Sequence, residues 1–152
     1  MIVADVMTEA SVVDSPDDTL RAAAARMWQQ QTGSLLIMDG DRLVGILTER
    51  DLLRAVARGA DVDTTPAREV MTSDVRTVDS GTSLHETARL MAANWIRHLP
   101  VVDAEKVVGV VSQRDLVGIL AALDPSPQGI ALPSDHLVRT RRLARIEHGD
   151  LD

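Results

Sequence analysis

Two seven-residue stretches of this 152-residue chain combine residue types that could bind a ligand. They read Gly45-Ile46-Leu47-Thr48-Glu49-Arg50-Asp51 and Gly109-Val110-Val111-Ser112-Gln113-Arg114-Asp115. In each stretch a hydroxyl residue follows an apolar run, and an aspartate comes three residues later, where both would lie at the start of a helix. A carboxylate in that position can accept hydrogen bonds from both hydroxyls of a ribose, and the glycine would let a ligand approach the strand closely.

Ordinary helix capping is the alternative explanation for both stretches. A Ser or Thr at the cap and an aspartate in the first turn are favourable at the positive end of any helix. A single copy would favour capping, whereas two copies at matching strand-to-helix junctions favour a role in ligand binding.

The two stretches belong to an internal repeat with an offset of 64 residues, the separation of Val6 from Val70. The same offset relates Val6-Met7-Thr8 to Val70-Met71-Thr72, Leu20 to Leu84, Met27 to Met91, Asp39 to Asp103, and Arg50-Asp51-Leu52 to Arg114-Asp115-Leu116. We expect one local shift, because Val13-Asp14-Ser15 matches Val78-Asp79-Ser80 at an offset of 65. A repeat of this kind indicates two copies of one structural unit.

Each repeat is predicted to fold as β-α-β-β-α, which places the chain in the α/β (α+β) class. A short extended segment, near Val13 or at 76–78, is followed by a helix with apolar residues at helical spacing. The candidate caps of these helices are Asp17, Asp18 or Thr19 in the first repeat and Thr82 or Ser83 in the second. Four apolar runs predict strands at residues 35–38, 43–47, 99–102 and 107–111, and a last helix begins near Thr48 or Ser112.

The predicted organisation is a first motif with its linker at residues 1–64, a second motif at 65–123, and a C-terminal tail at 124–152. One motif of this size would bury only about 60% of its unfolded surface, so we expect the two motifs to pair. The tail is expected to be partly disordered or to form a short helix. Its basic cluster could dock on an acidic partner or be a solvated helical face; it comprises Arg139, Arg141, Arg142 and Arg145.

Composition excludes several classes of function. The net charge of -7 argues against binding nucleic acid, and Trp28 and Trp95 are too few aromatic residues for a base-stacking surface. The absence of cysteine excludes thiol catalysis and thiolate zinc sites. No apolar run approaches the roughly 20 residues of a membrane span, and the N-terminus has no signal-peptide pattern, so we expect a cytoplasmic protein without membrane contact.

Over residues 3 to 122 the sequence resembles the CBS domain family, named after cystathionine β-synthase. The residues that carry the resemblance are Asp5-Val6-Met7-Thr8, Glu69-Val70-Met71-Thr72, His98-Leu99-Pro100-Val101-Val102-Asp103 and the two Gly-x-x-Thr/Ser-x-x-Asp stretches. The resemblance implies two tandem motifs that pack through their sheets as a pseudo-twofold module. It also implies two clefts for regulatory ligands that contain adenosine: AMP, ADP or ATP first, and S-adenosylmethionine or NAD second. No cofactor or metal is implied.

The resemblance also assigns residues to the two clefts. The first would combine Thr48 and Asp51 with Arg97, His98 and Arg114, and the second would combine Ser112 and Asp115 with Gly33, Ser34 and Arg50. Because the first set holds more cations for phosphate, the Asp51 cleft is predicted to bind a nucleotide more tightly. Adenine would lie near Val12, Val13 and Thr77. Arg97 and His98 could instead form a solvated edge before a buried strand.

The function predicted from the sequence is therefore regulatory ligand sensing, with a ligand-free dimerisation or protein-interaction module as the alternative. An enzyme would have to use Asp51 or Asp115 as a general base with His98, and the phosphate-loop, zinc-helix and nucleophile motifs are missing, so we expect no catalysis. A homodimer is expected through helical faces, unless these faces pack into the core instead. The candidate faces surround Ala24, Met27 and Trp28 and, in the second repeat, Leu90, Met91 and Trp95.

Overall fold

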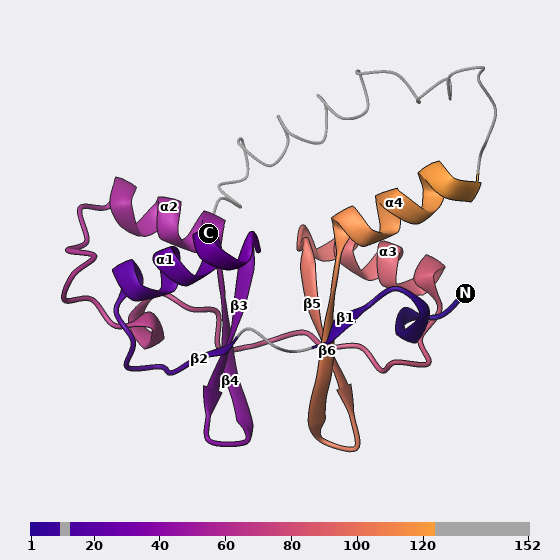
Figure 1. The fold of residues 1–152 in the computed structure, drawn as a ribbon, viewed down its shortest axis with the longest axis horizontal. Coiled ribbons are helices and arrows are strands. Elements are labelled where there is room, and N and C mark those ends of the chain that lie inside the picture. The colour runs from indigo at the N-terminus through magenta and orange to yellow at the C-terminus, as the bar shows by residue number, and fades with distance from the viewer. Residues whose placement is uncertain (10–12, 124–152) are drawn as a thin grey trace. The chain divides into compact units, whose positions relative to one another are not determined.

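Helices and strands follow the same order in both repeats of the computed structural model, which describes residues 1–9 and 13–123 (Figure 1). The helices are α1 (Leu20–Gln30), α2 (Glu49–Ala57), α3 (Leu84–Asn94) and α4 (Gln113–Leu123). The strands are β1 (Thr8–Glu9), β2 (Val13–Asp14), β3 (Ser34–Asp39), β4 (Arg42–Thr48), β5 (His98–Asp103) and β6 (Lys106–Ser112). Short 3-10 helices span Val3–Asp5 and Ala67–Glu69. The α/β class with two similar motifs is confirmed, whereas Val12 and the tail with its arginine cluster lie outside the described residues.

Local sequence signals explain where α1 and α3 begin and end. The hydroxyls of Thr19 and Ser83 accept hydrogen bonds of 3.2 Å from the backbone N–H groups three residues later, so both are N-caps. Each helix ends at a residue in the left-handed conformation, Gln31 (φ 52°) and Trp95 (φ 56°), which are related by the repeat offset. The two helices therefore have the same length and position in their motifs.

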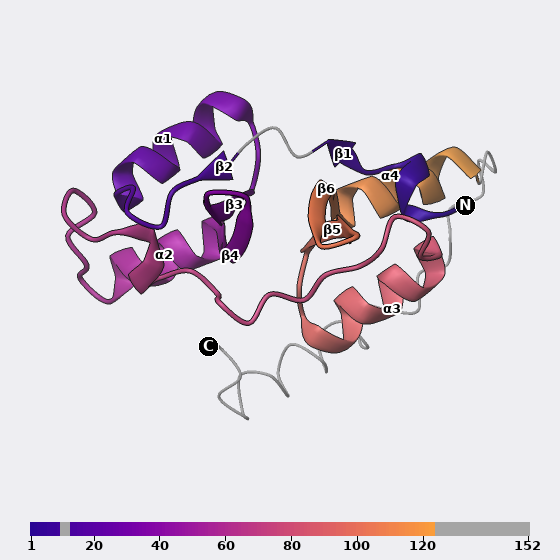
Figure 2. The same ribbon diagram turned by 90° about the horizontal axis from the view of Figure 1, so that it is seen from below.

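Each motif contains an antiparallel hairpin, β3–β4 in the first and β5–β6 in the second. In the first motif β2 adds a parallel strand beside β3, giving the order β2-β3-β4, and in the second the order is β1-β6-β5. Figures 1 and 2 show α1 and α2 together on one side of the β3–β4 hairpin and α3 and α4 on one side of β5–β6. Separate cores lie beneath the two helix pairs, centred on Leu35 and Leu47 in one and on Leu99 and Val111 in the other.

The segment that precedes each motif packs on the other motif. β1 pairs with β6, with Thr8 opposite Val110, and Thr72 makes the equivalent antiparallel bridge with Ile46 of β4. Val3 is fully buried in the core of the second motif, and the linker residue Ala67 is fully buried in the core of the first. Residues 1–9 thus complete the core of the second motif, and the linker completes the core of the first. Each core therefore contains residues from both sides of the boundary expected near residue 64.

The presence of a glycine at both equivalent positions, Gly45 and Gly109, is explained by this exchange. A Cβ atom at Gly109 would lie 2.7 Å from the Thr8 carbonyl oxygen, and one at Gly45 would collide with the Met71 side chain. Distances this short are not tolerated between a Cβ and backbone atoms. The expectation that these glycines admit a ligand is therefore wrong: each admits the exchanged segment from the other motif.

The register of the short extended segments also differs from expectation. Asp14 of β2 lies beside Ile37, and Val78 makes the equivalent parallel bridge with Val101. These pairs share the 64-residue offset, so Asp14 corresponds to Val78 and the predicted shift to 65 is wrong at this position. A carboxylate therefore occupies, in the first motif, the buried place of a valine in the second.

Within residues 1–9 and 13–123 no helix has the length and apolar character needed to cross a membrane.

Candidate functional site

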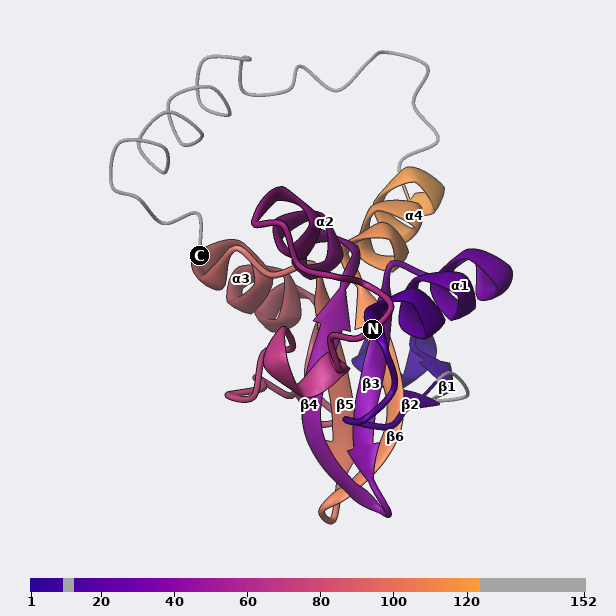
Figure 3. The same ribbon diagram turned by 90° about the vertical axis from the view of Figure 1, so that its left-hand side faces the viewer.

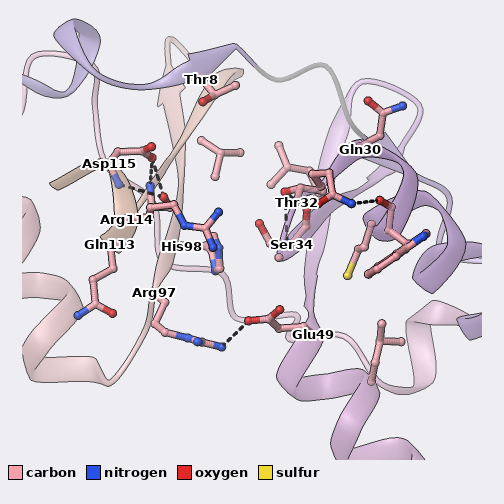
Figure 4. Close-up of a pocket in the computed structure, with 18 of the residues that line it drawn as sticks. Thr8, Gln30, Thr32, Ser34, Glu49, Arg97, His98, Gln113, Arg114 and Asp115 are labelled. Atoms are coloured by element: carbon pink, nitrogen blue, oxygen red, sulfur yellow. Dashed lines mark hydrogen bonds and ion pairs between the residues drawn. The ribbon is translucent and has the colours of Figure 1, made fainter. Parts of the chain in front are cut away.

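A cleft of about 930 Å³ is lined by residues of both motifs (Figure 4). One wall is the junction between β6 and α4, and the other is the C-terminal part of α1 with the loop that enters β3. Its polar lining residues include Thr8, Glu9, Thr32, Ser34, Glu49, Arg97, His98, Ser112, Gln113, Arg114 and Asp115. Its apolar lining residues include Met27, Trp28, Leu36 and Val110. A cleft of this size can hold a small organic ligand.

Asp115 lies on the cleft wall at the start of α4. Its Oδ2 accepts hydrogen bonds of 2.7 Å from the backbone N–H and from the hydroxyl of Ser112. The Asp115 N–H in turn donates to the Ser112 Oγ at 3.3 Å. These bonds form a reciprocal helix cap that holds the carboxylate in place, and they use only one of its two oxygens.

Three basic side chains share the cleft with this carboxylate. Figure 4 shows Arg114 and His98 extending from the second motif toward Thr32 and Ser34 of the first. Arg97 reaches the first residue of α2, where its Nη2 lies 3.1 Å from Oε1 of Glu49. The cleft therefore offers a carboxylate on one side and a group of nitrogen donors beside it.

Burial lowers the pKa of the His98 imidazole, and the neighbouring Arg97 guanidinium lowers it further. The carboxylates of Glu49 and Asp115 act in the opposite direction but do not reverse the shift. These effects favour the neutral imidazole form of His98, which can donate one hydrogen bond and accept another.

Asp51 makes the same cap at the start of α2 but does not line this cleft. Its Oδ2 accepts hydrogen bonds of 2.8 Å from the N–H and the hydroxyl of Thr48. Its Oδ1 accepts one of 2.8 Å from Nη2 of Arg54, one turn further along the helix. Both oxygens of this buried carboxylate are therefore engaged within α2.

The structure combines the predicted site residues differently from the sequence analysis. Arg97, His98 and Arg114 line the cleft of Ser112 and Asp115, together with Gly33 and Ser34, and Thr48 and Asp51 are not among the lining residues of this cleft. Arg50, Val13 and Thr77 are exposed and do not belong to its lining. The two arginines and the histidine expected beside Asp51 thus share a cleft with Asp115.

Sequence reasoning missed several residues of this cleft. Thr8 and Glu9 reach it only because β1 is exchanged onto the second motif, and Glu49 reaches it through its ion pair with Arg97. Outside this cleft, the contact of Arg54 with Asp51 has a signal in the repeat, since the residue 64 positions later is Gly118. Comparison of the two copies at every position would have revealed that the aspartates have different neighbours.

Comparisons with known proteins agree on one family. A family model described as CBS domain matches residues 3–58 and 67–122. The CBS domain-containing protein YhcV of Bacillus subtilis is 38% identical over 115 residues, which cover 75% of this chain and 81% of that protein. The crystal structure of the CBS domain protein NE2398 has a TM-score of 0.75 and 35% identity, covering 82% of this chain and 98% of that one.

A further solved structure contains ligands. The CBS domain pair of protein MJ0100, in complex with 5-methylthioadenosine and S-adenosyl-L-methionine, has a TM-score of 0.74 and 25% identity. The match covers 82% of this chain and 98% of that one.

Proposed function

Because this chain belongs to the CBS domain family, we propose that it is a regulatory module that senses an adenosine-containing nucleotide in the cleft beside Asp115. The observation that carries the proposal is the composition of that cleft, where a fixed carboxylate faces the same space as Arg97, His98 and Arg114. Adenosine ligands in the similar structure of MJ0100 support this choice of class.

The two kinds of group suit the two ends of a nucleotide. The Asp115 carboxylate accepts hydrogen bonds from ribose hydroxyls, and the Ser112 hydroxyl is adjacent for a third contact. The guanidinium groups of Arg97 and Arg114 are suited to bidentate contacts with a phosphate, and His98 supplies a further donor. Binding would draw groups of both motifs onto one molecule and so favour one arrangement of the module over others.

Arg97 and Arg114 favour phosphate-bearing ligands on their side of the cleft, although the carboxylates of Glu9, Glu49 and Asp115 also belong to its lining. AMP, ADP and ATP bring negative charge to the arginines, whereas the sulfonium of S-adenosylmethionine brings positive charge. The pyrophosphate of NAD would also suit the arginines, but the cleft would have to accommodate a second nucleoside. We therefore rank the adenine nucleotides first, and we infer a regulatory function without catalysis.

Exposed apolar residues support a second candidate function, association through helices. Leu53 and Val56 of α2 are 71% and 60% exposed, and the equivalent residues of α4, Val117 and Leu120, are 56% and 63% exposed. Met27 and Met91, expected on a dimer face, are buried in the cores. We propose that the α2 and α4 faces mediate a homodimer, which is compatible with ligand sensing and would also serve a ligand-free interaction module.

Thermal denaturation with added ligand tests the proposal. AMP, ADP or ATP in large excess over its dissociation constant is expected to raise the melting temperature by several degrees, because ligand that binds only the folded state stabilises it by about 2.7 kcal/mol at 100 times Kd. The matched control is Asp115→Asn, which keeps the size of the side chain and removes its charge. An unchanged melting temperature with all three nucleotides and with S-adenosylmethionine would instead favour the ligand-free interaction module.

A further inference from the structure

The two aspartates of the repeat differ in one neighbour. Asp51 and Asp115 make the same cap, with closely similar distances to the hydroxyl residue three positions earlier. In the first motif Arg54 then occupies the second oxygen of Asp51 at 2.8 Å. In the second motif the equivalent residue is Gly118, which has no side chain to reach Asp115.

This ion pair is shielded from water. The Asp51 side chain is only 8% exposed and the Arg54 side chain 27% exposed. A ligand hydroxyl would have to displace a charge-assisted hydrogen bond to reach this carboxylate, and such bonds are about twice as strong as neutral ones. Arg54 therefore competes from within the chain for the group that would bind ribose.

A second contact, between the two motifs, also has no counterpart in the repeat. Arg97 pairs with Glu49 at 3.1 Å across the two motifs. The equivalent positions are Gly33 and Gln113, which line the Asp115 cleft and cannot form an ion pair. Arg97 and Glu49 themselves line the Asp115 cleft, so this ion pair crosses that cleft and leaves Arg54 as the group that distinguishes the Asp51 position.

From the difference between Arg54 and Gly118 we infer that the chain binds one adenosine ligand, at Asp115, and that Arg54 keeps the Asp51 position closed. This inference rests on the proposed function and reverses the preference that the count of cations in the sequence suggests. It identifies Arg54 and Gly118 as the pair of positions that sets the number of ligands per chain.

The repeat provides reciprocal variants for a test. Arg54→Gly copies the second motif into the first, and Gly118→Arg copies the first into the second. The Gly118 position has room for a side chain, because a Cβ built there has no atom within 4 Å. Arg54→Ala also removes the guanidinium but keeps the helix propensity that glycine would reduce. It replaces Arg54→Gly in the test if the glycine variant does not fold.

Titration calorimetry with AMP measures the number of sites and the affinity of each variant. We expect one site per chain in the unmodified protein, two sites in Arg54→Gly and Arg54→Ala, and an affinity about 10- to 100-fold weaker in Gly118→Arg. Asp115→Ala should abolish the single site of the unmodified protein, and Asp51→Ala should leave it intact. Circular dichroism and melting temperature establish that each variant is folded.

The outcomes separate this inference from the proposed function. Two sites in the unmodified protein, a single site that is lost in Asp51→Ala, or a folded Arg54→Ala variant that still has one site would each overturn the inference while adenosine binding stands. Absence of AMP binding in every folded variant, with S-adenosylmethionine and ATP also giving no heat, would refute the proposed function and the inference with it.

Discussion

Asp14 is the residue whose environment departs most from that of its counterpart in the other motif. It is 3% exposed in β2, pairs with Arg26 of α1, and has a buried Oδ2 without a hydrogen-bond partner among the described residues. Burial raises the pKa of this carboxyl to about 6, and the nearby Asp18 adds to the shift. The second motif has Val78 and Leu90 at the equivalent positions, so the same packing site is apolar there.

The raised pKa fixes how Asp14 contributes to stability. The folded state holds the proton more tightly than the unfolded state, whose carboxyl titrates near 3.8. The free energy of unfolding therefore falls as pH rises from about 4 to about 6, and the loss persists above pH 6. A shift of this size corresponds to about 3 kcal/mol as an order of magnitude.

Replacing the ion pair by its apolar counterpart is expected to stabilise the protein. The double variant Asp14→Val with Arg26→Leu should raise the free energy of unfolding at pH 7 by about 1 to 3 kcal/mol, since buried ion pairs are often weaker than the apolar residues that replace them. The gain should shrink at pH 4, where Asp14 is protonated. Urea denaturation at both pH values measures it.

The single variant Arg26→Leu is the control for this prediction. It leaves the buried carboxylate without its cation and should destabilise the protein at pH 7 by about 3 kcal/mol. A double variant that is less stable than the unmodified protein at pH 7 would show that the ion pair stabilises the fold.

At the scale of elements, the two hairpins differ in their turns. The β5–β6 turn has Ala104 (φ 47°) and Glu105 (φ 64°) in the left-handed region, whereas the β3–β4 turn has a positive φ only at Gly40 (φ 61°). Figure 3 shows the β3–β4 turn at the end of its hairpin remote from α1 and α2. A non-glycine residue in left-handed backbone costs about 1 to 2 kcal/mol, so the second turn stores strain that the first avoids.

Glu105→Gly is expected to relieve part of this strain. The free energy of unfolding should rise by about 1 kcal/mol, because glycine adopts a positive φ without the steric penalty of a Cβ. Asp41→Gly provides the matched control, since Asp41 is the equivalent turn position and does not have a positive φ. That variant should be neutral or destabilising, and a gain of equal size in both would contradict the explanation. Urea denaturation of both variants measures the changes.

The elements themselves were largely predictable from the sequence. Turn residues, caps and apolar periodicity located the four helices and four long strands within one to three residues, because these signals act over a few neighbouring positions. The exchange of β1 onto β6 was not predictable, since pairing between distant segments leaves no local pattern. The same limit applies to the site: the sequence predicts Arg97, His98 and Arg114 beside Asp51, whereas in the structure they line the cleft that contains Asp115.

At the scale of the whole molecule, the exchanged segments make the two motifs interdependent. Val3 completes one core and Ala67 the other, so separation of the motifs would expose apolar surface in both. Because the motifs depend on each other, the proposed ligand, which would contact both of them in the Asp115 cleft, would affect the positions of both helix pairs. A conformational change on binding would then be transmitted to a second copy of the chain through the apolar faces of α2 and α4.

Charge on these faces should prevent dimerisation without disturbing the fold. Leu53→Glu with Leu120→Glu adds carboxylates at positions that are 71% and 63% exposed, where they cost little in the monomer but would be desolvated against a second copy. The unmodified protein is expected to have the mass of a dimer by size-exclusion chromatography with light scattering, and the variant that of a monomer. Arg42→Glu, on the exposed hairpin turn away from both faces, is the control and should remain dimeric. If the variant keeps the mass of a dimer, the dimer interface lies on another surface. If the unmodified protein is a monomer, these apolar faces bind a partner other than a second copy of this chain.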